Sequence, residues 1–263
     1  MEDHVRNAEN YISRSKSIFR FFKSRDDYLK LAYEQYVIAS NICLQNSDIN
    51  LSIYHLEKGC NLMFSILNYE DNVIENYLKL VKLSRYVDSR KYLFFSEKIV
   101  PIILNCNNKY INFLPEIYQG LIFFNKNSRN LNKVYMYYEQ LIDYYRQNEK
   151  YRFGEIVSEY VDYSIRNDED CNFKHLSNLL NEASLISNKY LLQTYLFESI
   201  LIDIYTLDVE VAKEKLKRIN SINKEFFLLS DLIFYCYNEK ETNNTINKYR
   251  KIINQKWYYK LFI

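Results

Sequence analysis

Histidine, a side chain that often catalyses reactions or binds metals, occurs only three times in this chain, and the three residues stand far apart in the sequence. Its histidines are His4, His55 and His175, and none has a cysteine, histidine or carboxylate at zinc-site spacing. We expect His55 and His175 to take surface or core-edge positions on helices. Adjacent carboxylates occur at residues 26–27 and 168–170, where we expect them to cap helix starts. The sequence therefore predicts no metal site and no catalytic centre.

Glycine is equally scarce, because Gly59, Gly120 and Gly154 are the only three among 263 residues. Loops that cradle a phosphate need glycines close together, as in G-x-G-x-x-G or G-x-x-x-x-G-K-[ST]. Three isolated glycines form neither pattern, which excludes a P-loop and a glycine-fingerprint dinucleotide site. We expect no cofactor, and we expect that the protein is not an enzyme.

The low number of glycines and prolines also indicates that helices are the elements that must position any functional residue. Ordinary usage would give about 18 glycines and about 13 prolines at this length, whereas the chain has three glycines and two prolines. Strands and tight turns need the backbone conformations that these residues supply. Apolar residues instead recur with helical periodicity in blocks of about 15–20 residues. The sequence predicts an all-α fold, a tetratricopeptide-like α-solenoid of antiparallel helical hairpins with a C-terminal helical bundle.

The predicted solenoid covers residues 1–187 and the predicted bundle covers residues 188–263, without a flexible linker between them. Similar patterns at residues 132–139 and 173–180 lie about 41 residues apart, which suits helix-pair repeats. We expect helical blocks at residues 2–18, 26–44, 48–67, 73–87, 89–105, 111–125, 131–147, 151–166, 173–187, 190–206, 209–219, 224–237 and 241–261.

Charge and cysteine content give weaker indications. The net charge of +2 implies no general attraction to nucleic acid. An odd number of scattered cysteines without a secretory signal predicts a reduced, cytoplasmic protein. No apolar run approaches the roughly 20 residues that a bilayer crossing needs.

Two segments could carry binding. Between the first two helical blocks, Ile18, Phe19, Phe21 and Phe22 alternate with basic residues. Aromatic rings flanked by cations suit a bilayer interface, but these rings could equally fold back over the first helix pair. The second segment, Asn247–Ile263, has five basic residues and no acidic one, and it ends in aromatic and aliphatic side chains. It could form a docking tip or a capping helix that closes the core.

Three stretches resemble the soluble NSF-attachment proteins, which are adaptors between SNARE bundles and the N-ethylmaleimide-sensitive ATPase. Ala8–Tyr11, followed by the phenylalanine-rich segment and Tyr33–Cys43, is similar to the first two helices of that family. The sequence Leu131–Tyr145 is similar to I-E-K-A-x-x-x-Y-E-Q-A-x-x-x-Y, with Tyr-Glu-Gln in register. Tyr249–Leu261 is similar to the closing Y-D-x-I…L-D-x-W-L-x-x-x-L-L.

The resemblance implies roles for particular residues. The membrane-contacting loop of the family falls on Ile18, Phe19, Phe21 and Phe22. Its SNARE-facing lysines fall on Lys133 and Lys174, and a third falls on Glu210, with Lys213 one turn later. Glu239, Glu241 and Leu261 are the implied contacts to the hexameric ATPase.

The implied function is a peripheral membrane adaptor in SNARE disassembly during vesicle traffic. The chain departs from the family where Asn254–Tyr258 replaces the Leu-Asp-x-Trp-Leu motif. The alternative is a tetratricopeptide-like scaffold subunit that binds a peptide or another protein complex without lipid or ATPase contacts.

Overall fold

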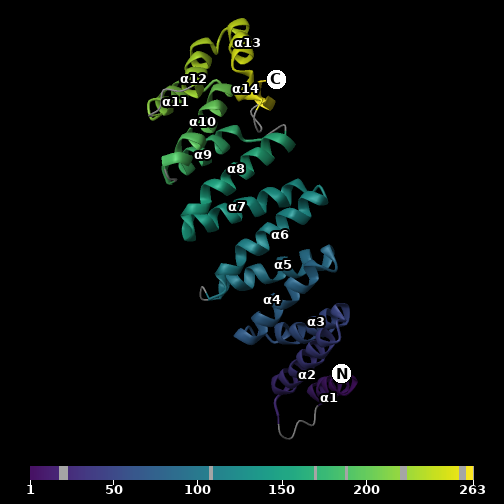
Figure 1. Ribbon diagram of the computed structural model, residues 1–263. Helices are drawn as coiled ribbons and strands as arrows, with labels where there is room; N and C mark the ends of the chain where they lie inside the picture. The colour runs from purple at the N-terminus through teal and green to yellow at the C-terminus, as the bar shows by residue number, and fades with distance from the viewer. Residues whose placement is uncertain are drawn as a thin grey trace. The chain divides into compact units, whose positions relative to one another are not determined.

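The computed structural model describes residues 1–17, 23–106, 109–168, 171–186, 189–219, 224–254 and 259–262. Every regular element in these ranges is a helix (Figure 1). The predicted all-α class is therefore confirmed. The helices are α1 (Glu2–Lys16), α2 (Arg25–Gln45), α3 (Ile49–Ser65), α4 (Asp71–Arg85), α5 (Ser89–Asn105), the 3-10 helix η1 (Ile111–Phe113), α6 (Leu114–Asn127), α7 (Leu131–Asn148), α8 (Lys150–Asn167), α9 (Phe173–Ile186), α10 (Lys189–Tyr205), α11 (Val209–Leu216), α12 (Lys224–Tyr235), α13 (Glu239–Lys248), α14 (Arg250–Ile253) and α15 (Tyr259–Phe262).

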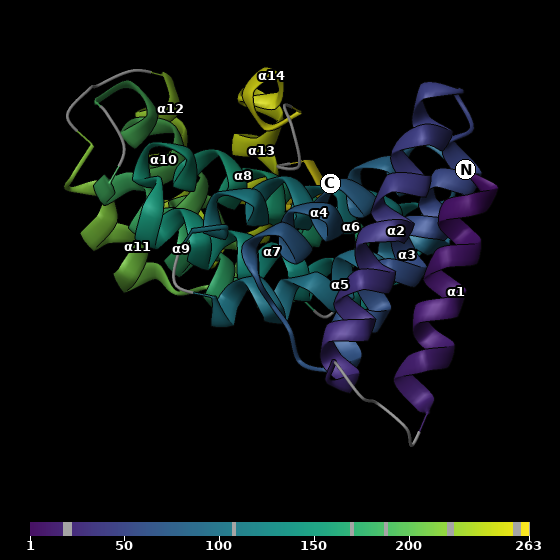
Figure 2. The same cartoon turned by 90° about the horizontal axis from the view of Figure 1, so that it is seen from below.

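Helix contacts divide the chain into two compact units, Met1–Ser128 and Arg129–Ile263, here called the N-terminal and the C-terminal unit. Within each unit, helices pack against their neighbours in sequence as helical hairpins, such as α2 with α3 and α9 with α10. Figure 2 shows α1 lying alongside α2 in the N-terminal unit. The boundary predicted at residues 187–188 falls inside the C-terminal unit, between α9 and α10, which pack on each other.

Polar bridges between alternate helices define the repeat. In the N-terminal unit, Lys98 on α5 donates to Asn61 on α3 over 37 residues, and Lys79 on α4 donates to Asn41 on α2 over 38 residues. In the C-terminal unit, Arg218 reaches Asn181 on α9 over 37 residues. A spacing this regular is that of stacked helix pairs, each contributing about 40 residues.

Several turns between helices use an Asp or Asn side chain as an N-cap. Asp48 accepts from the backbone N–H of Leu51 at 3.0 Å, and Asn130 accepts from that of Lys133 at 3.4 Å. The residues before these caps, Ser47 and Arg129, have φ of 60° and 56°. A left-handed residue followed by an Asx cap reverses the chain without a glycine, which explains how so many turns form in a glycine-poor chain.

The prediction that the adjacent carboxylates cap helix starts is confirmed at residues 26–27, which lie in the first turn of α2, and is wrong for Asp168, whereas residues 169–170 lie outside the described residues. Ser24 is the N-cap of α2, and Asp27 completes a capping box by accepting from the Ser24 backbone N–H at 3.0 Å. Asp168 is the C-cap of α8. Helix α9 is capped by Asn172, which accepts from the backbone N–H of His175 at 3.0 Å.

The predicted helical block at 241–261 is also wrong, because the structure breaks it into α13, α14 and α15. Helix α13 is polar along most of its length and buries only Thr245 and Ile246. An element with so narrow an apolar face gains little from continuing. The other predicted blocks each contain a helix, with ends that differ by a few residues.

All three glycines lie inside helices, and each packs against a tyrosine side chain of a neighbouring helix. A Cβ on Gly120 would lie 1.9 Å from the Tyr92 hydroxyl oxygen, and one on Gly154 would lie 2.4 Å from a ring carbon of Tyr195. Neither glycine has positive φ. Their role is to leave room for a neighbouring helix, which lets bulky tyrosines fill the interior at close helix spacing.

Candidate functional site

The three histidines each have a different environment in the structure. His4 pairs with Gln35 at 2.8 Å, His55 is buried against the Tyr36 ring, and His175 pairs with Glu139 at 2.8 Å. Within the described ranges, no three His, Cys, Asp or Glu side chains could hold a metal ion. Burial raises the pKa of the Cys60 thiol to about 12, which keeps it protonated and unreactive.

The predicted membrane-contact residues Ile18, Phe19, Phe21 and Phe22 lie outside the described residues. Their flanks are described: α1 ends at Lys16 and α2 starts at Arg25. In the part of the chain that the structure describes, no helix has the length and apolar character needed to span a membrane.

The three predicted SNARE-binding lysines lie on alternate helices of the C-terminal unit. Lys133 is half-buried in the first turn of α7, and Lys174 is exposed at the start of α9. Lys213 on α11 is exposed, and its ammonium pairs with Glu210 at 2.7 Å. That pairing raises the pKa of Lys213 and reduces the positive charge it presents to a partner.

Side-chain bridges set the register between these helices. His175 on α9 contacts Glu139 in the third turn of α7. Further along, Arg146 of α7 donates to both carboxylate oxygens of Glu182, at 2.7 and 3.1 Å. Lys174, next to His175, therefore lies level with the third turn of α7, whereas Lys133 lies in the first. The structure brings Lys133 and Lys174 to helices joined by these bridges but staggers them along the helix axes.

The predicted ATPase contacts fall on two short helices. Glu239 is exposed and Glu241 is half-buried in the first turn of α13, where carboxylates also oppose the helix dipole. Leu261 on α15 is only 7% exposed. Helix α15 packs against α10, and the Lys260 ammonium donates to the carbonyl oxygen of Arg166 at the end of α8. In this structure Leu261 is part of the packed interior.

A buried polar cluster was missed from the sequence. The Lys215 ammonium on α11 donates to Ser177 on α9 at 2.8 Å, to Ser199 on α10 at 2.7 Å and to Asp203 on α10 at 2.6 Å. All four residues are at least nine-tenths buried. Burial raises the pKa of Asp203, and the bonds from Lys215 and Ser177 oppose that rise. The cluster joins three helices, and no spacing rule within one helix could have identified it.

An acidic groove between α8 and α10 was also missed. It has a volume of about 500 Å³, and its α8 wall carries Glu155, Glu159 and Asp162. Arg166 pairs with Asp162 at 2.8 Å, and Tyr138 donates to Glu159 at 2.5 Å. One turn separates each carboxylate from the next, a pattern that the sequence displays but that also describes an ordinary solvated helix face.

Comparison with protein-family models yields no match, and no curated protein matches the chain. The case for a function therefore rests on the hairpin fold, the placement of the residues above and the three similar stretches of sequence.

Proposed function

We propose that this protein is a non-enzymatic adaptor that binds SNARE bundles and recruits the N-ethylmaleimide-sensitive ATPase for their disassembly in vesicle traffic. The observation that carries the proposal is the segment Leu131–Tyr145, whose similarity to the attachment proteins coincides with a single helix, α7. This helix bears Lys133 and begins the series of hairpins that also carries Lys174 and Lys213.

The mode of binding follows from charge and form. Lysines on alternate helices of the solenoid could contact an elongated acidic bundle along its length, because each repeat adds contacts of the same kind. Lys174 is exposed and suited to this role, whereas Lys213 would first have to exchange its Glu210 partner. Contact of Ile18, Phe19, Phe21 and Phe22 with lipid would raise the local concentration of adaptor at membrane-anchored SNAREs.

The alternative is a helical scaffold subunit for a peptide or another complex. Two observations favour it: Lys213 is already paired, and Leu261 is buried rather than displayed. A scaffold of this kind would need neither lipid nor an ATPase.

A pull-down with an assembled SNARE bundle, with and without the ATPase, tests the proposal. We expect the protein to bind the bundle and to retain the ATPase, and Lys133→Glu combined with Lys174→Glu to weaken bundle binding. Lys150→Glu combined with Lys224→Glu is the matched control, since both lysines are exposed at the starts of α8 and α12. Binding to neither partner would contradict the proposal and leave the scaffold alternative.

The lipid contact has its own assay. Phe19→Ser combined with Phe22→Ser should slow disassembly of liposome-borne SNARE complexes and leave disassembly in detergent nearly unchanged. Equal loss in both assays would show that these phenylalanines support folding rather than membrane binding.

A further inference from the structure

The last helices of the C-terminal unit form a pocket that none of the sites above uses. It has a volume of about 470 Å³ and lies where the start of α12 meets the joint between α13 and α14. Helix α12 packs on α13, and α13 contacts α14, so one unit supplies the lining (Figure 1). Small-molecule sites usually measure about 300–1,000 Å³. The pocket is therefore large enough for a small ligand.

The lining of this pocket is strongly basic. Its exposed cations are Lys224, Lys248, Arg250 and Lys251, and among the described residues that line it none is acidic. Lys248 pairs with Asp231 at 3.0 Å, whereas the other three form no ion pair within the described part of the chain. The pocket therefore has an excess of positive charge that an anionic ligand would neutralise.

A contact to α12 holds the joint between α13 and α14 in place. Asp231 on α12 accepts from the Lys248 ammonium at 3.0 Å and from the Tyr249 hydroxyl at 3.2 Å. Because that hydroxyl already has an acceptor, Tyr249 offers a ligand mainly the surface of its ring. Ile252 adds aliphatic surface to the same pocket. These two side chains suit the carbon skeleton of a ligand, and the cations suit its charged groups.

The number of cations favours phosphate over carboxylate. A phosphate monoester carries about −1.5 to −2 charges at pH 7 and three acceptor oxygens, whereas a carboxylate carries one charge and two oxygens. Two phosphate groups would therefore balance the four cations of the pocket. Arg250 can bind a phosphate through two parallel N–H bonds, and each lysine can act as a point charge.

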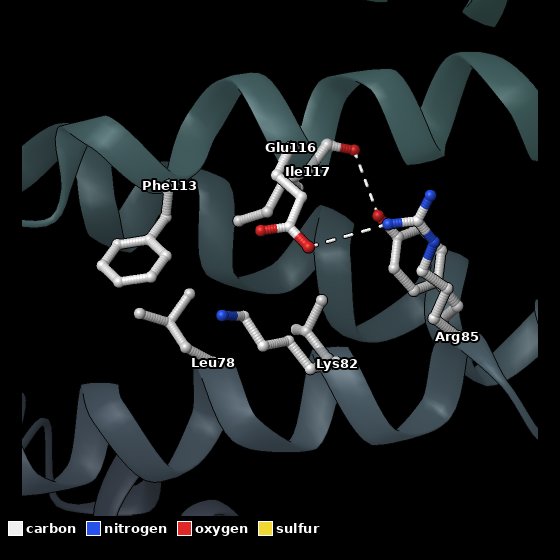
Figure 3. Close-up of a pocket in the computed structure, with 8 residues that line it drawn as sticks. Leu78, Lys82, Arg85, Phe113, Glu116 and Ile117 are labelled. Atoms are coloured by element: carbon white, nitrogen blue, oxygen red, sulfur yellow. Dashed lines mark hydrogen bonds and ion pairs between the residues drawn. The ribbon is translucent and has the colours of Figure 1, made fainter.

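A hollow in the N-terminal unit shows by contrast how little room other parts of the surface offer. Figure 3 shows Leu78 and Lys82 of α4 facing Phe113 across it. Arg85 and Glu116, which also line it, pair at 3.6 Å. Its space of about 20 Å³ holds about one water molecule. Of these two places, only the basic pocket has room for a ligand.

We propose that the basic pocket binds a compact ligand that carries at least two phosphate groups. The ligand is either a soluble polyol phosphate or the headgroup of a phosphorylated lipid, since both present the same phosphates on a small carbon ring. This proposal uses none of the lysines of the SNARE proposal and stands without it.

The soluble source is tested by NMR of the full-length, isotope-labelled protein. The probes are inositol trisphosphate, inorganic phosphate and unphosphorylated inositol. We expect the trisphosphate to shift the amide signals of Lys224 and of residues 247–254 in a saturable manner. Inorganic phosphate should bind at least about tenfold more weakly, because one phosphate engages only part of the cations. Inositol should leave these signals unchanged.

The lipid source is tested by sedimentation with vesicles of phosphatidylcholine and phosphatidylinositol bisphosphate. Vesicles of phosphatidylcholine and phosphatidylserine with equal surface charge are the comparison. The Phe19→Ser, Phe22→Ser variant is used throughout, so that the proposed phenylalanine contact with lipid does not contribute. Stronger binding to the phosphoinositide vesicles, displaced by soluble inositol trisphosphate, would assign a lipid headgroup. Binding of the soluble trisphosphate without preferential vesicle binding would assign a soluble ligand.

Charge-reversal variants separate the pocket from general charge effects. Arg250→Glu combined with Lys251→Glu should weaken binding of inositol trisphosphate by at least about tenfold, because two charge-assisted contacts are lost. Arg90→Glu combined with Lys91→Glu is the matched control, since it reverses an adjacent Arg-Lys pair in the first turn of α5. The control should leave the affinity unchanged. Arg250 and Lys251 are exposed, so the helices should remain, and circular dichroism verifies this.

Three results would overturn the proposal. The first is that neither the trisphosphate nor the phosphoinositide vesicles bind. The second is that inorganic phosphate binds as tightly as the trisphosphate, or phosphatidylserine vesicles as tightly as phosphoinositide vesicles. The third is that both double variants weaken binding equally, which would show that only the net charge of the protein matters.

Discussion

At the scale of single residues, the structure separates polar groups that hold the fold from polar groups that face solvent. Lys215 is 7% exposed and has an acceptor for each of its three N–H bonds. Lys217, two residues later, is 70% exposed and pairs with Glu214 at 2.7 Å. The two ion pairs are similar in length, but only the first removes charge from water, so their contributions to stability should differ widely.

Lys215→Met should lower the free energy of unfolding by about 3–5 kcal/mol, because it leaves the Asp203 carboxylate buried without its cation. Urea denaturation followed by circular dichroism measures the change. Lys217→Met is the matched control and should cost less than about 1 kcal/mol. Adding Asp203→Leu to Lys215→Met should restore much of the loss; if it does not, the desolvated charge is not its cause.

His55 should make stability depend on pH. Burial, the largest cause, lowers the pKa of His55 from its ordinary value of 6.5, and Lys58 lowers it further. The unfolded chain therefore binds a proton at His55 at pH values where the imidazole in the folded protein is still neutral. Stability from the neutral imidazole is fully present above the unfolded pKa and is lost as pH falls toward the folded pKa, with a slope of at most about 1.4 kcal/mol per pH unit.

His55→Phe should remove this dependence while keeping an aromatic ring against Tyr36. The measurement is the difference in free energy of unfolding between the wild type and the variant from pH 7.5 to about pH 5. His4→Asn, which changes a histidine bonded to Gln35 near the surface, serves as the control. A difference that stays constant over this interval would show that His55 does not titrate between the two states.

At the scale of elements, the close approach of neighbouring helices depends on glycine. Helices α5 and α6 meet where Tyr92 lies over Gly120, and Tyr195 of α10 lies over Gly154 of α8. In an exposed helix, alanine would be favoured over glycine by about 1 kcal/mol. At these two contacts the added methyl group would overlap the ring, so packing outweighs helix propensity.

Gly120→Ala and Gly154→Ala should each lower the free energy of unfolding by about 1–3 kcal/mol, the usual cost of overpacking. Gly59→Ala is the informative comparison, because its Cβ would lie 3.2 Å from Tyr33 and Tyr36 atoms. There the gain in helix propensity offsets the tight contact, and the change should stay within about 1 kcal/mol of zero. Equal effects at all three glycines would show that the tyrosine overlap does not decide the outcome.

At the scale of the whole molecule, contacts between consecutive helices within each unit predict stepwise unfolding. Stability in such repeat arrays is roughly the sum of local interfaces, so the N-terminal and C-terminal units need not open together. Ile53 and Leu141 are fully buried, one in each unit. They allow each unit to be destabilised by itself.

Ile53→Ala should accelerate amide hydrogen exchange within residues 1–128 only, and Leu141→Ala within residues 129–263 only. Each deletion of a buried aliphatic side chain should cost about 2–5 kcal/mol in its own unit. Exchange in mild denaturant, resolved by mass spectrometry of peptides, measures both. If either variant accelerates exchange throughout the chain, the two units unfold as one.

Much of the fold could be predicted from the sequence. The lack of glycine and proline and the helical periodicity indicated the all-α hairpins, and the block predicted at residues 48–67 begins within one residue of α3. These features depend on residues within a few positions of one another, where backbone propensity and capping act. The break of residues 241–261 into short helices was not predicted, because it depends on how little of α13 finds a surface to pack on.

Little of the candidate sites, in contrast to the fold, could be predicted from the sequence. From the sequence, Lys133, Lys174 and Lys213 could be assigned only by resemblance, and Leu261 could be either a tip or part of the core. The tertiary structure staggered Lys133 and Lys174 along their helix axes, paired Lys213 with Glu210 and buried Leu261. It also assembled the Lys215 cluster from three separate helices. The sequence by itself determined most of the helical segments, because helix formation there depends on local interactions, but not the break within residues 241–261. Only the tertiary structure decided which side chains meet, because contacts between helices depend on the packing of residues far apart in the chain.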